Sequence, residues 1–214
     1  MTQAKRKRSN PLALAVLVLL YERPMHPYEM AATLRERHKE DSIKLRYGSL
    51  YTVIALLVKA GFIVARHTTR EGHRPEKTIY NLTTAGVTEL RHWMRAILST
   101  PIKEFPQFEA GLSLLPALPP EEAAGLLDLR IDLLNKEIEK VNAGLREAKA
   151  MKLAPLFTIE SEYRAAGLEM ERDFVQDLAA RIRKDGCGFR EEWGKSSAQK
   201  AQRAKQTSRR NRRS

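Results

Sequence analysis

Over its first sixty positions, the pattern of apolar and polar residues predicts three short helices. The first runs from about Asn10 to Arg23 and is apolar on nearly every face, as expected of a helix buried beneath others. The second lies in HPYEMAATLRERH, residues 26–38, where Pro27 suits the first helical position. Its inward-facing residues are expected to be Tyr28, Met30, Ala31 and Leu34.

The third helix is predicted within RYGSLYTVIALLVKAGFI, which begins at Arg46. Ser49 is the expected N-cap, because its hydroxyl can accept a hydrogen bond from a first-turn amide. Gly61 ends the helix. The buried stripe recurs at helical spacing and consists of Leu50, Val53, Ile54 and Leu57.

After Gly61 the period changes, and two β-branched segments predict a hairpin. FIVARHTTR and KTIYNLT flank a turn that contains Gly72 and Pro75. Thr83 or Thr84 can cap the next helix, whose expected inner face is Val87, Leu90, Met94 and Ile97. Three short helices followed by a hairpin indicate a winged helix-turn-helix domain, which we assign to residues 10–98.

The second half of the chain predicts a helical arm over residues 99–190. A Pro-punctuated segment with one short helix around Phe105 and Leu115 leads into a heptad repeat from Glu121 onward, and a second long helix is expected from about Leu156 to Lys184. That helix carries Ile159, Tyr163, Ala166, Met170, Phe174, Leu178 and Ile182. The two long helices should form an antiparallel arm whose seam a second subunit can share; the predicted dimerisation residues are Leu127, Ile131, Leu134, Ile138, Val141, Leu145, Met170, Phe174 and Leu178. The expected fold class is mainly α with a small β-hairpin.

The net charge of +12 is concentrated at the two ends of the chain. Residues 1–8 contain four basic side chains and residues 195–214 contain eight, with no acid in either segment. Between them, residues 9–100 have 13 basic and 8 acidic side chains, whereas residues 101–194 have 13 and 18. A positive front half with basic ends suits a polyanion such as DNA. We treat residues 1–9 as a basic N-terminal arm and residues 191–214 as a disordered basic tail, which can add salt-sensitive DNA affinity or act only as a solubility tail.

Several classes of function are disfavoured by the sequence. The single cysteine, Cys187, cannot form an intrachain disulfide, which favours a reducing cytoplasm. The apolar run LALAVLVLL has nine residues, about half the roughly 20 needed to cross a bilayer. The pair His67 and His73 lacks further ligands for a metal site. We find no nucleophile elbow, phosphate loop or paired catalytic carboxylates, so we expect neither enzymatic activity nor a cofactor.

A helix that enters the major groove buries one face and presents its N-terminal residues to DNA. The third helix has this division, because its polar and small residues lie opposite the buried stripe. The hairpin tip adds basic residues that can reach the backbone or minor groove, although a solvated loop would show the same composition. The predicted DNA-binding residues are Lys44, Arg46, Tyr47, Gly48, Ser49, Tyr51, Thr52, Arg70, His73, Arg74 and Lys77.

These segments together resemble the PadR family of bacterial transcriptional regulators. The resemblance rests on HPYEM at 26–30, GSLYTVIALLVKAGFI at 48–63 and GHRPEKTIYNLTTAG at 72–86, in this order and spacing. The helical second half resembles the longer PadR subfamily. The resemblance implies a cytoplasmic homodimer that binds a pseudo-palindromic operator in double-stranded DNA, most often as a repressor, and it implies DNA contacts for Ser49, Tyr51, Arg74 and Lys77.

Two further questions remain open at the level of sequence. Trp93 can stack on a small aromatic effector, as aromatic residues do in some proteins that this chain resembles, or it can be a core or interface tryptophan. The alternative function is that of a nucleoid- or RNA-associated protein that binds without sequence preference through its basic ends.

Overall fold

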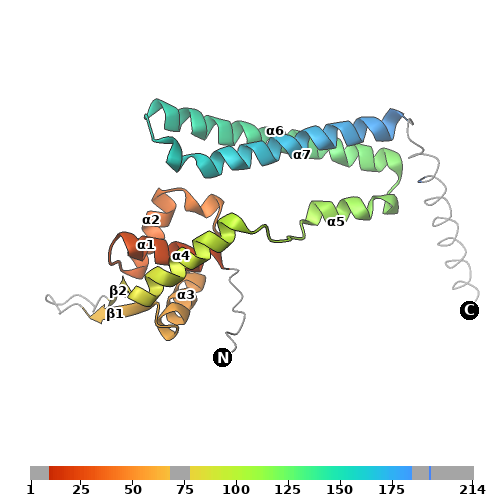
Figure 1. The fold of residues 1–214 in the computed structure, drawn as a ribbon. Helices are drawn as coiled ribbons and strands as arrows, with labels where there is room; N and C mark the ends of the chain where they lie inside the picture. The colour runs from red at the N-terminus through yellow and green to blue at the C-terminus, as the bar shows by residue number, and fades with distance from the viewer. Residues whose placement is uncertain (1–9, 68–77, 185–192, 194–214) are drawn as a thin grey trace, which may run out of the picture. The chain divides into compact units, whose positions relative to one another are not determined.

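The computed structural model describes residues 10–67, 78–184 and 193, and the chain divides into two compact units between Lys103 and Glu104 (Figure 1). The basic arm, the tip of the hairpin, Cys187 and the basic tail apart from the buried Trp193 lie outside the described residues. Within these residues, no helix is both long and apolar enough to cross a membrane, and no cluster of three or more metal-ligating side chains is found.

Helix α1, Pro11–Glu22, is the central helix of the first unit, as the sequence predicts. Asn10 caps it by accepting a hydrogen bond from the Leu12 amide at 3.1 Å, and Pro11 occupies the first turn, where its missing N–H costs nothing. The chain leaves the helix at Arg23 in an extended conformation, as the residue before a proline prefers. Buried residues come from several sides of α1: Leu12, Ala15, Val16, Leu17, Leu19 and Leu20.

Helix α2, Pro27–Glu36, confirms the predicted start but corrects one inward-facing residue. Met30, Ala31 and Leu34 are buried together with Pro27, whereas the Tyr28 side chain is 67% exposed. The buried positions follow the i, i+3, i+4, i+7 spacing from Pro27, and Tyr28 lies one residue off this stripe. Tyr28 therefore belongs to the solvent face.

Helix α3, Tyr47–Lys59, starts two residues before the predicted N-cap. The N-cap is Arg46, which has extended backbone angles, and Ser49 lies inside the first turn, so the expectation for Ser49 is wrong. Between α2 and α3 the chain makes one 3₁₀ turn at Lys39–Asp41, with His38 in the left-handed region at φ 52°. The buried stripe of α3 is the predicted one: Leu50, Val53, Ile54 and Leu57.

The predicted hairpin is present as strands β1, Ile63–His67, and β2, Thr78–Leu82, paired antiparallel with Ile63 opposite Leu82. Gly61 makes the turn from α3 into β1 at φ 74°, a conformation that favours glycine. An additional bridge between Met25 and Tyr80 ties the hairpin to the segment before α2. The first unit is therefore a winged helix-turn-helix.

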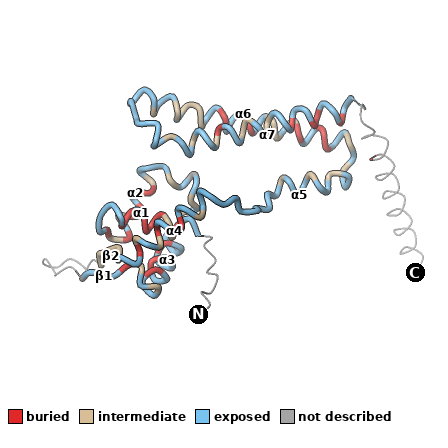
Figure 2. The backbone as a smooth tube through the Cα atoms, viewed as in Figure 1, coloured by how far each residue is buried: buried red, intermediate tan, exposed pale blue. Residues whose placement is uncertain are grey.

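Helix α4, Thr84–Ser99, follows β2 and is capped by Thr83, whose Oγ1 accepts from the Gly86 amide at 3.0 Å. Its buried residues are Gly86, Leu90 and Trp93, so the predicted inner face is wrong for Met94 and Ile97, which are exposed. Trp93 occupies the inward position one residue before Met94, and its larger ring covers the core there. Figure 2 shows the buried residues of the first unit concentrated where α1, α3 and α4 meet.

The second unit contains the predicted antiparallel arm of two long helices. Helices α6, Pro120–Ala150, and α7, Ile159–Lys184, lie side by side along their length (Figure 1), preceded by the short helix α5, Gln107–Ser113. Arg130 joins all three helices, because its guanidinium lies 3.7 Å from the Phe108 ring centroid and its Nε donates to Glu171 at 2.7 Å. The heptad of α6 faces inward: Leu127, Leu134 and Ile138 are buried, and Ile131, Val141 and Leu145 are half-buried.

The face that α7 turns toward α6 agrees with the predicted stripe at Leu178 and Ile182 and differs from it elsewhere. It contains Ala165, Val175, Leu178, Ala179 and Ile182, whereas Ile159, Tyr163, Ala166, Met170 and Phe174 are exposed. The small alanine side chains permit close approach of two helices, so they occupy the seam in place of the larger residues. The larger residues form a second apolar stripe on α7, turned away from α6.

Candidate nucleic-acid interface

The exposed face of α3 opposite its buried stripe is formed by six residues, which are small, polar or aromatic except for one leucine. Tyr51 is 54% exposed, and Leu56, which the sequence analysis did not single out, is 60% exposed. We define this face as Gly48, Ser49, Tyr51, Thr52, Ala55 and Leu56. It presents hydroxyls and methyl groups but no carboxylate, so it can contact phosphate oxygens and base edges without charge repulsion.

The N-terminus of α3 differs from those of its neighbours in having no side-chain cap. Helices α1, α2 and α4 are capped by Asn10, His26 and Thr83 respectively, whereas Arg46 offers no side-chain acceptor to the first turn of α3. The amides of Tyr47, Gly48 and Ser49 precede the first intrahelical bond, which Leu50 donates to the Arg46 carbonyl at 3.0 Å. Uncapped first-turn amides and the positive end of the helix dipole favour an anion such as a phosphate.

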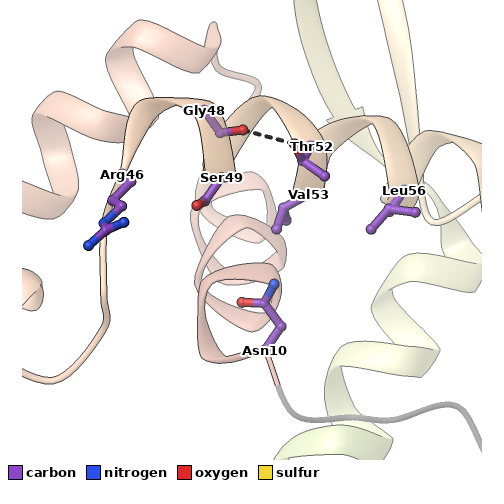
Figure 3. A pocket seen from close by; sticks show the side chains of 7 residues that line it. All are labelled: Asn10, Arg46, Gly48, Ser49, Thr52, Val53 and Leu56. Atoms are coloured by element: carbon purple, nitrogen blue, oxygen red, sulfur yellow. Dashed lines mark hydrogen bonds between the residues drawn. The ribbon is translucent and has the colours of Figure 1, made fainter.

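An open hollow of about 520 Å³ lies beside this helix end (Figure 3). It is lined by residues of α3 and by the N-cap residue of α1. Its lining residues are Asn10, Arg46, Gly48, Ser49, Thr52, Val53 and Leu56. Thr52 donates its hydroxyl hydrogen to the Gly48 carbonyl oxygen at 2.9 Å, which leaves its methyl group and oxygen lone pairs for other contacts. The hollow places Asn10 next to the exposed face of α3, which no sequence pattern indicates.

Three cationic side chains lie near the N-terminus of α3. Two of them precede the helix in the sequence, and the third comes from α2. Lys44 and Arg46 precede the helix and are exposed. Arg35, on α2, donates from Nη1 to the Tyr47 hydroxyl at 2.8 Å, and its guanidinium carbon lies 4.6 Å from the centroid of the Tyr47 ring. The sequence analysis missed Arg35, because twelve residues and a turn separate it from Tyr47.

The predicted contacts at the tip of the hairpin, Arg70, His73, Arg74 and Lys77, lie outside the described residues. The strand that leads toward this tip is described, and Arg66 on it is exposed. Among the predicted DNA-binding residues, the structure thus brings together those at and before the start of α3: Lys44, Arg46, Tyr47, Gly48, Ser49, Tyr51 and Thr52.

Trp93, the predicted effector-binding residue, lies in the core of the winged domain and is 7% exposed. Its indole Nε1 is buried and has no hydrogen-bond partner among the described residues. The indole therefore packs against its own domain.

The predicted dimerisation residues fall into three groups, of which the half-buried one consists of Ile131, Val141 and Leu145. Leu127, Leu134, Ile138 and Leu178 are buried within the chain by the packing of α6 on α7, whereas Met170 and Phe174 are exposed. The sequence analysis missed a row of exposed leucines on the side of α6 away from α7, consisting of Leu126, Leu129 and Leu133.

The first unit has the winged-helix fold, and comparison with known proteins identifies the family of this domain. Residues 16–92 match the transcriptional regulator PadR-like family. The chain therefore carries a domain of the PadR-like transcriptional regulator family over these residues. A comparison with curated protein sequences gives no match.

Solved structures with the same fold include PadR of Bacillus subtilis in complex with operator DNA, which is 21% identical with a TM-score of 0.64 over 81% of this chain and 99% of that chain. The same protein in complex with p-coumaric acid is 20% identical with a TM-score of 0.63, over 85% and 100% of the two chains. The smu.1604c protein of Streptococcus mutans is 20% identical with a TM-score of 0.53, over 80% and 99%. These similarities confirm the expected fold class, including the helical second half.

Proposed function

We propose that the protein is a homodimeric, cytoplasmic repressor that binds a pseudo-palindromic operator, with α3 of each subunit in the major groove. The observation that carries this proposal is the uncapped N-terminus of α3 beside an exposed, carboxylate-free helix face. In this arrangement the first-turn amides and the Tyr47, Ser49 and Tyr51 hydroxyls bind phosphates, while Thr52, Ala55 and Leu56 approach base edges.

The hairpin completes the interface in this proposal. Arg66 is exposed on β1, and the basic residues Arg70, His73, Arg74 and Lys77 follow along the chain. A basic wing beside a recognition helix adds phosphate or minor-groove contacts that fix the orientation of the domain on DNA. The winged domain comprises residues 10–98 and the dimerisation domain residues 99–190.

Dimerisation is supported by the apolar surface that the second unit leaves uncovered. Tyr163, Met170 and Phe174 on α7 and the exposed leucine row on α6 are too many large apolar side chains for an ordinary solvent face. A second copy of the arm would bury both stripes while the buried heptad residues hold α6 and α7 together. A two-fold dimer then presents two recognition helices to two half-sites.

Repression and effector release rest on the structural relatives. PadR of Bacillus subtilis forms a complex with operator DNA, and a protein bound to an operator can exclude other proteins from the same DNA. The p-coumaric acid complex of that protein supports a small aromatic effector for this chain. Such an effector releases DNA only if it binds the DNA-free arrangement more tightly, and a contact with Trp93 would require the winged domain to open around its buried indole.

The proposal is tested by selecting genomic DNA fragments with the purified full-length protein at about 0.15 M salt, where weak phosphate-only binding is partly screened. A small set of fragments that share an inverted repeat is expected. Tyr51→Ala serves as the control and should recover none of them. Uniform recovery across the genome would instead favour a non-specific nucleoid-associated protein.

A further inference from the structure

The contact between Arg35 and Tyr47 joins α2 to the first residue of α3. The Arg35 guanidinium donates to the Tyr47 hydroxyl oxygen and lies against the face of the same ring. One side chain therefore contacts both the hydroxyl and the ring of Tyr47. Tyr47 remains 44% exposed, so the contact does not bury the hydroxyl in the protein.

The hydrogen bond determines what the Tyr47 hydroxyl can do next. A tyrosine hydroxyl has one hydrogen to donate and two lone pairs to accept, and arginine can only donate. Because Arg35 occupies a lone pair, the hydroxyl hydrogen is left to point at another acceptor. A cationic donor also polarises the hydroxyl, which strengthens the bond that this hydrogen makes.

A phosphate oxygen is such an acceptor, and the uncapped first turn of α3 is where the proposed function places one. We propose that Arg35 is a positioning residue of the DNA interface, which holds the Tyr47 hydroxyl as an oriented donor to a DNA phosphate. This inference rests on the proposed function, and it assigns to α2 a part in DNA binding that the exposed face of α3 alone does not contain.

The surroundings of Arg35 favour action through Tyr47 over direct contact with phosphate. Glu40 faces the same guanidinium, with its Oε2 3.9 Å from the Arg35 Nε. A carboxylate at this position offsets the charge of Arg35 and repels a phosphate that approaches the guanidinium itself. Among the described residues the Tyr47 hydroxyl has no carboxylate partner, and it extends from the first turn of the recognition helix.

The test is a double-mutant cycle with Arg35→Met and Tyr47→Phe, measured by fluorescence anisotropy. Two labelled duplexes of equal length are used, one recovered by the genomic selection and one of random sequence. Each single variant should lower the affinity for DNA on the order of tenfold, as expected for a charge-assisted hydrogen-bond chain. The affinity of the double variant should be at most about twofold below that of the single variant that binds DNA less tightly, because both substitutions break the same chain. A purely structural role is tested by thermal unfolding, and the melting temperature of Arg35→Met should match that of wild type.

The salt dependence separates positioning from direct contact. Loss of a cation bound to phosphate lowers the slope of log K against log salt by about 0.9, whereas Arg35→Met should change it by less than about 0.3. Arg95→Met, which removes one exposed charge from α4 of the same domain, is the matched control and should leave affinity close to wild type.

Additive losses in the cycle, a slope change near that of a full phosphate contact, or wild-type affinity of Arg35→Met would each overturn the inference. The random duplex keeps the two proposals separate. If the wild-type protein binds both duplexes equally, the sequence-specific function fails, yet the cycle on the random duplex still decides the role of Arg35, because phosphate contacts do not depend on sequence. If it binds neither duplex, both proposals fail.

Discussion

Gly86 in the first turn of α4 lies directly against the backbone of Phe62, at the junction between α3 and β1. A Cβ built on Gly86 would be 2.1 Å from the Phe62 carbonyl oxygen and 2.6 Å from Leu82 Cδ1. The same junction is held by Thr83, whose Oγ1 donates to the Gly61 carbonyl oxygen at 2.8 Å or to that of Phe62 at 3.0 Å. The wing is thereby fixed to the recognition helix through α4.

Gly86→Ala is therefore expected to destabilise the winged domain, because the backbone of Phe62 cannot move aside without breaking this junction. Overpacking of this kind costs about 1–3 kcal/mol and occasionally more. Gly144→Ala, in the interior of α6, is the matched control, since nothing lies within 4 Å of its added Cβ. It should stabilise the protein by up to about 1 kcal/mol. Chemical denaturation of both variants measures the difference, and equal stabilities would refute the close packing at Gly86.

Tyr51→Ala is expected to abolish operator binding and leave the oligomeric state unchanged. The Tyr51 side chain is 54% exposed on α3 and lies outside the core, so its removal should not unfold the domain. Tyr28→Ala, which removes a tyrosine of similar exposure from α2, is the matched control and should retain most of the affinity. Anisotropy titrations and size-exclusion chromatography with light scattering provide the two measurements. Survival of operator affinity in Tyr51→Ala would mean that α3 is not the recognition helix.

The tie between α1 and α2 predicts a pH-dependent contribution to stability. Arg37 donates two hydrogen bonds to the Glu22 carboxylate, both at 2.7 Å, and these bonds lower the pKa of Glu22 below its ordinary value. A carboxyl whose pKa is lowered on folding stabilises the protein above its unfolded pKa, and this stabilisation is lost as the pH falls through the folded pKa. Glu22→Gln should thus cost stability at neutral pH and little in acid.

Because both side chains are more than one-third exposed, the effect at pH 7 should not exceed about 1 kcal/mol. Urea unfolding of Glu22→Gln and of the wild-type protein at neutral pH and below the pKa of Glu22 measures it. Glu139→Gln is the control, since Glu139 pairs with Arg146 on one exposed face of α6 and joins no two helices. A difference between Glu22→Gln and wild type that persists unchanged in acid would show that the ion pair is not its cause.

The elements of the winged domain could be predicted from sequence because each depends on local signals. Helical spacing identified α1 to α4, and β-branched runs around a turn identified the hairpin. The N-cap of α3 could not be predicted in this way. Serine is a preferred N-cap residue, but tertiary contacts outweigh the preference: Tyr47 is fixed by Arg35 of α2, and the helix begins there.

The seam between α6 and α7 shows the same limit at the level of packing. Apolar spacing identified the heptad of α6 correctly, but on α7 it favoured the row with the largest residues. In the structure, Ala165 and Ala179 face α6, while Tyr163 and Met170 are exposed. Two apolar stripes on one helix have the same period, so only the partner helix decides which of them is buried within the chain.

The exposed stripe on α7 gives a prediction about assembly. Phe174→Glu should dissociate the proposed dimer, because a carboxylate would be buried in an apolar interface, without unfolding the arm, because the side chain is 45% exposed within one chain. Met151→Glu, at the exposed end of α6, is the matched control and should remain a dimer. Leu134→Ala should show the opposite behaviour, with a loss of folding stability of about 2–5 kcal/mol from a buried cavity. Light scattering measures the oligomeric state and thermal unfolding measures the stability. If Phe174→Glu remained a dimer, the dimer interface would have to lie on another surface.

The basic ends of the chain are expected to contribute affinity but not sequence preference. Residues 195–214 carry eight basic side chains, and Lys5 to Arg8 precede Asn10, which lines the hollow beside α3. An extended chain reaches at most about 3.6 Å per residue, so the four N-terminal cations are tethered close to the recognition helix. Phosphate contacts from such segments steepen the salt dependence of binding and do not depend on the DNA sequence.

Deletion of residues 195–214 should therefore reduce the slope of log K against log salt while the ratio of operator to random-duplex affinity stays the same. Replacement of Lys5, Arg6, Lys7 and Arg8 by glutamine should also reduce the slope, and its effect per cation should be larger, because only one or a few residues join these charges to Asn10 beside α3. A scrambled tail of the same composition is the control for the deletion, and it should bind as wild type does. If either change removed the preference for the operator, the basic ends would be part of sequence recognition, and α3 alone would not account for it.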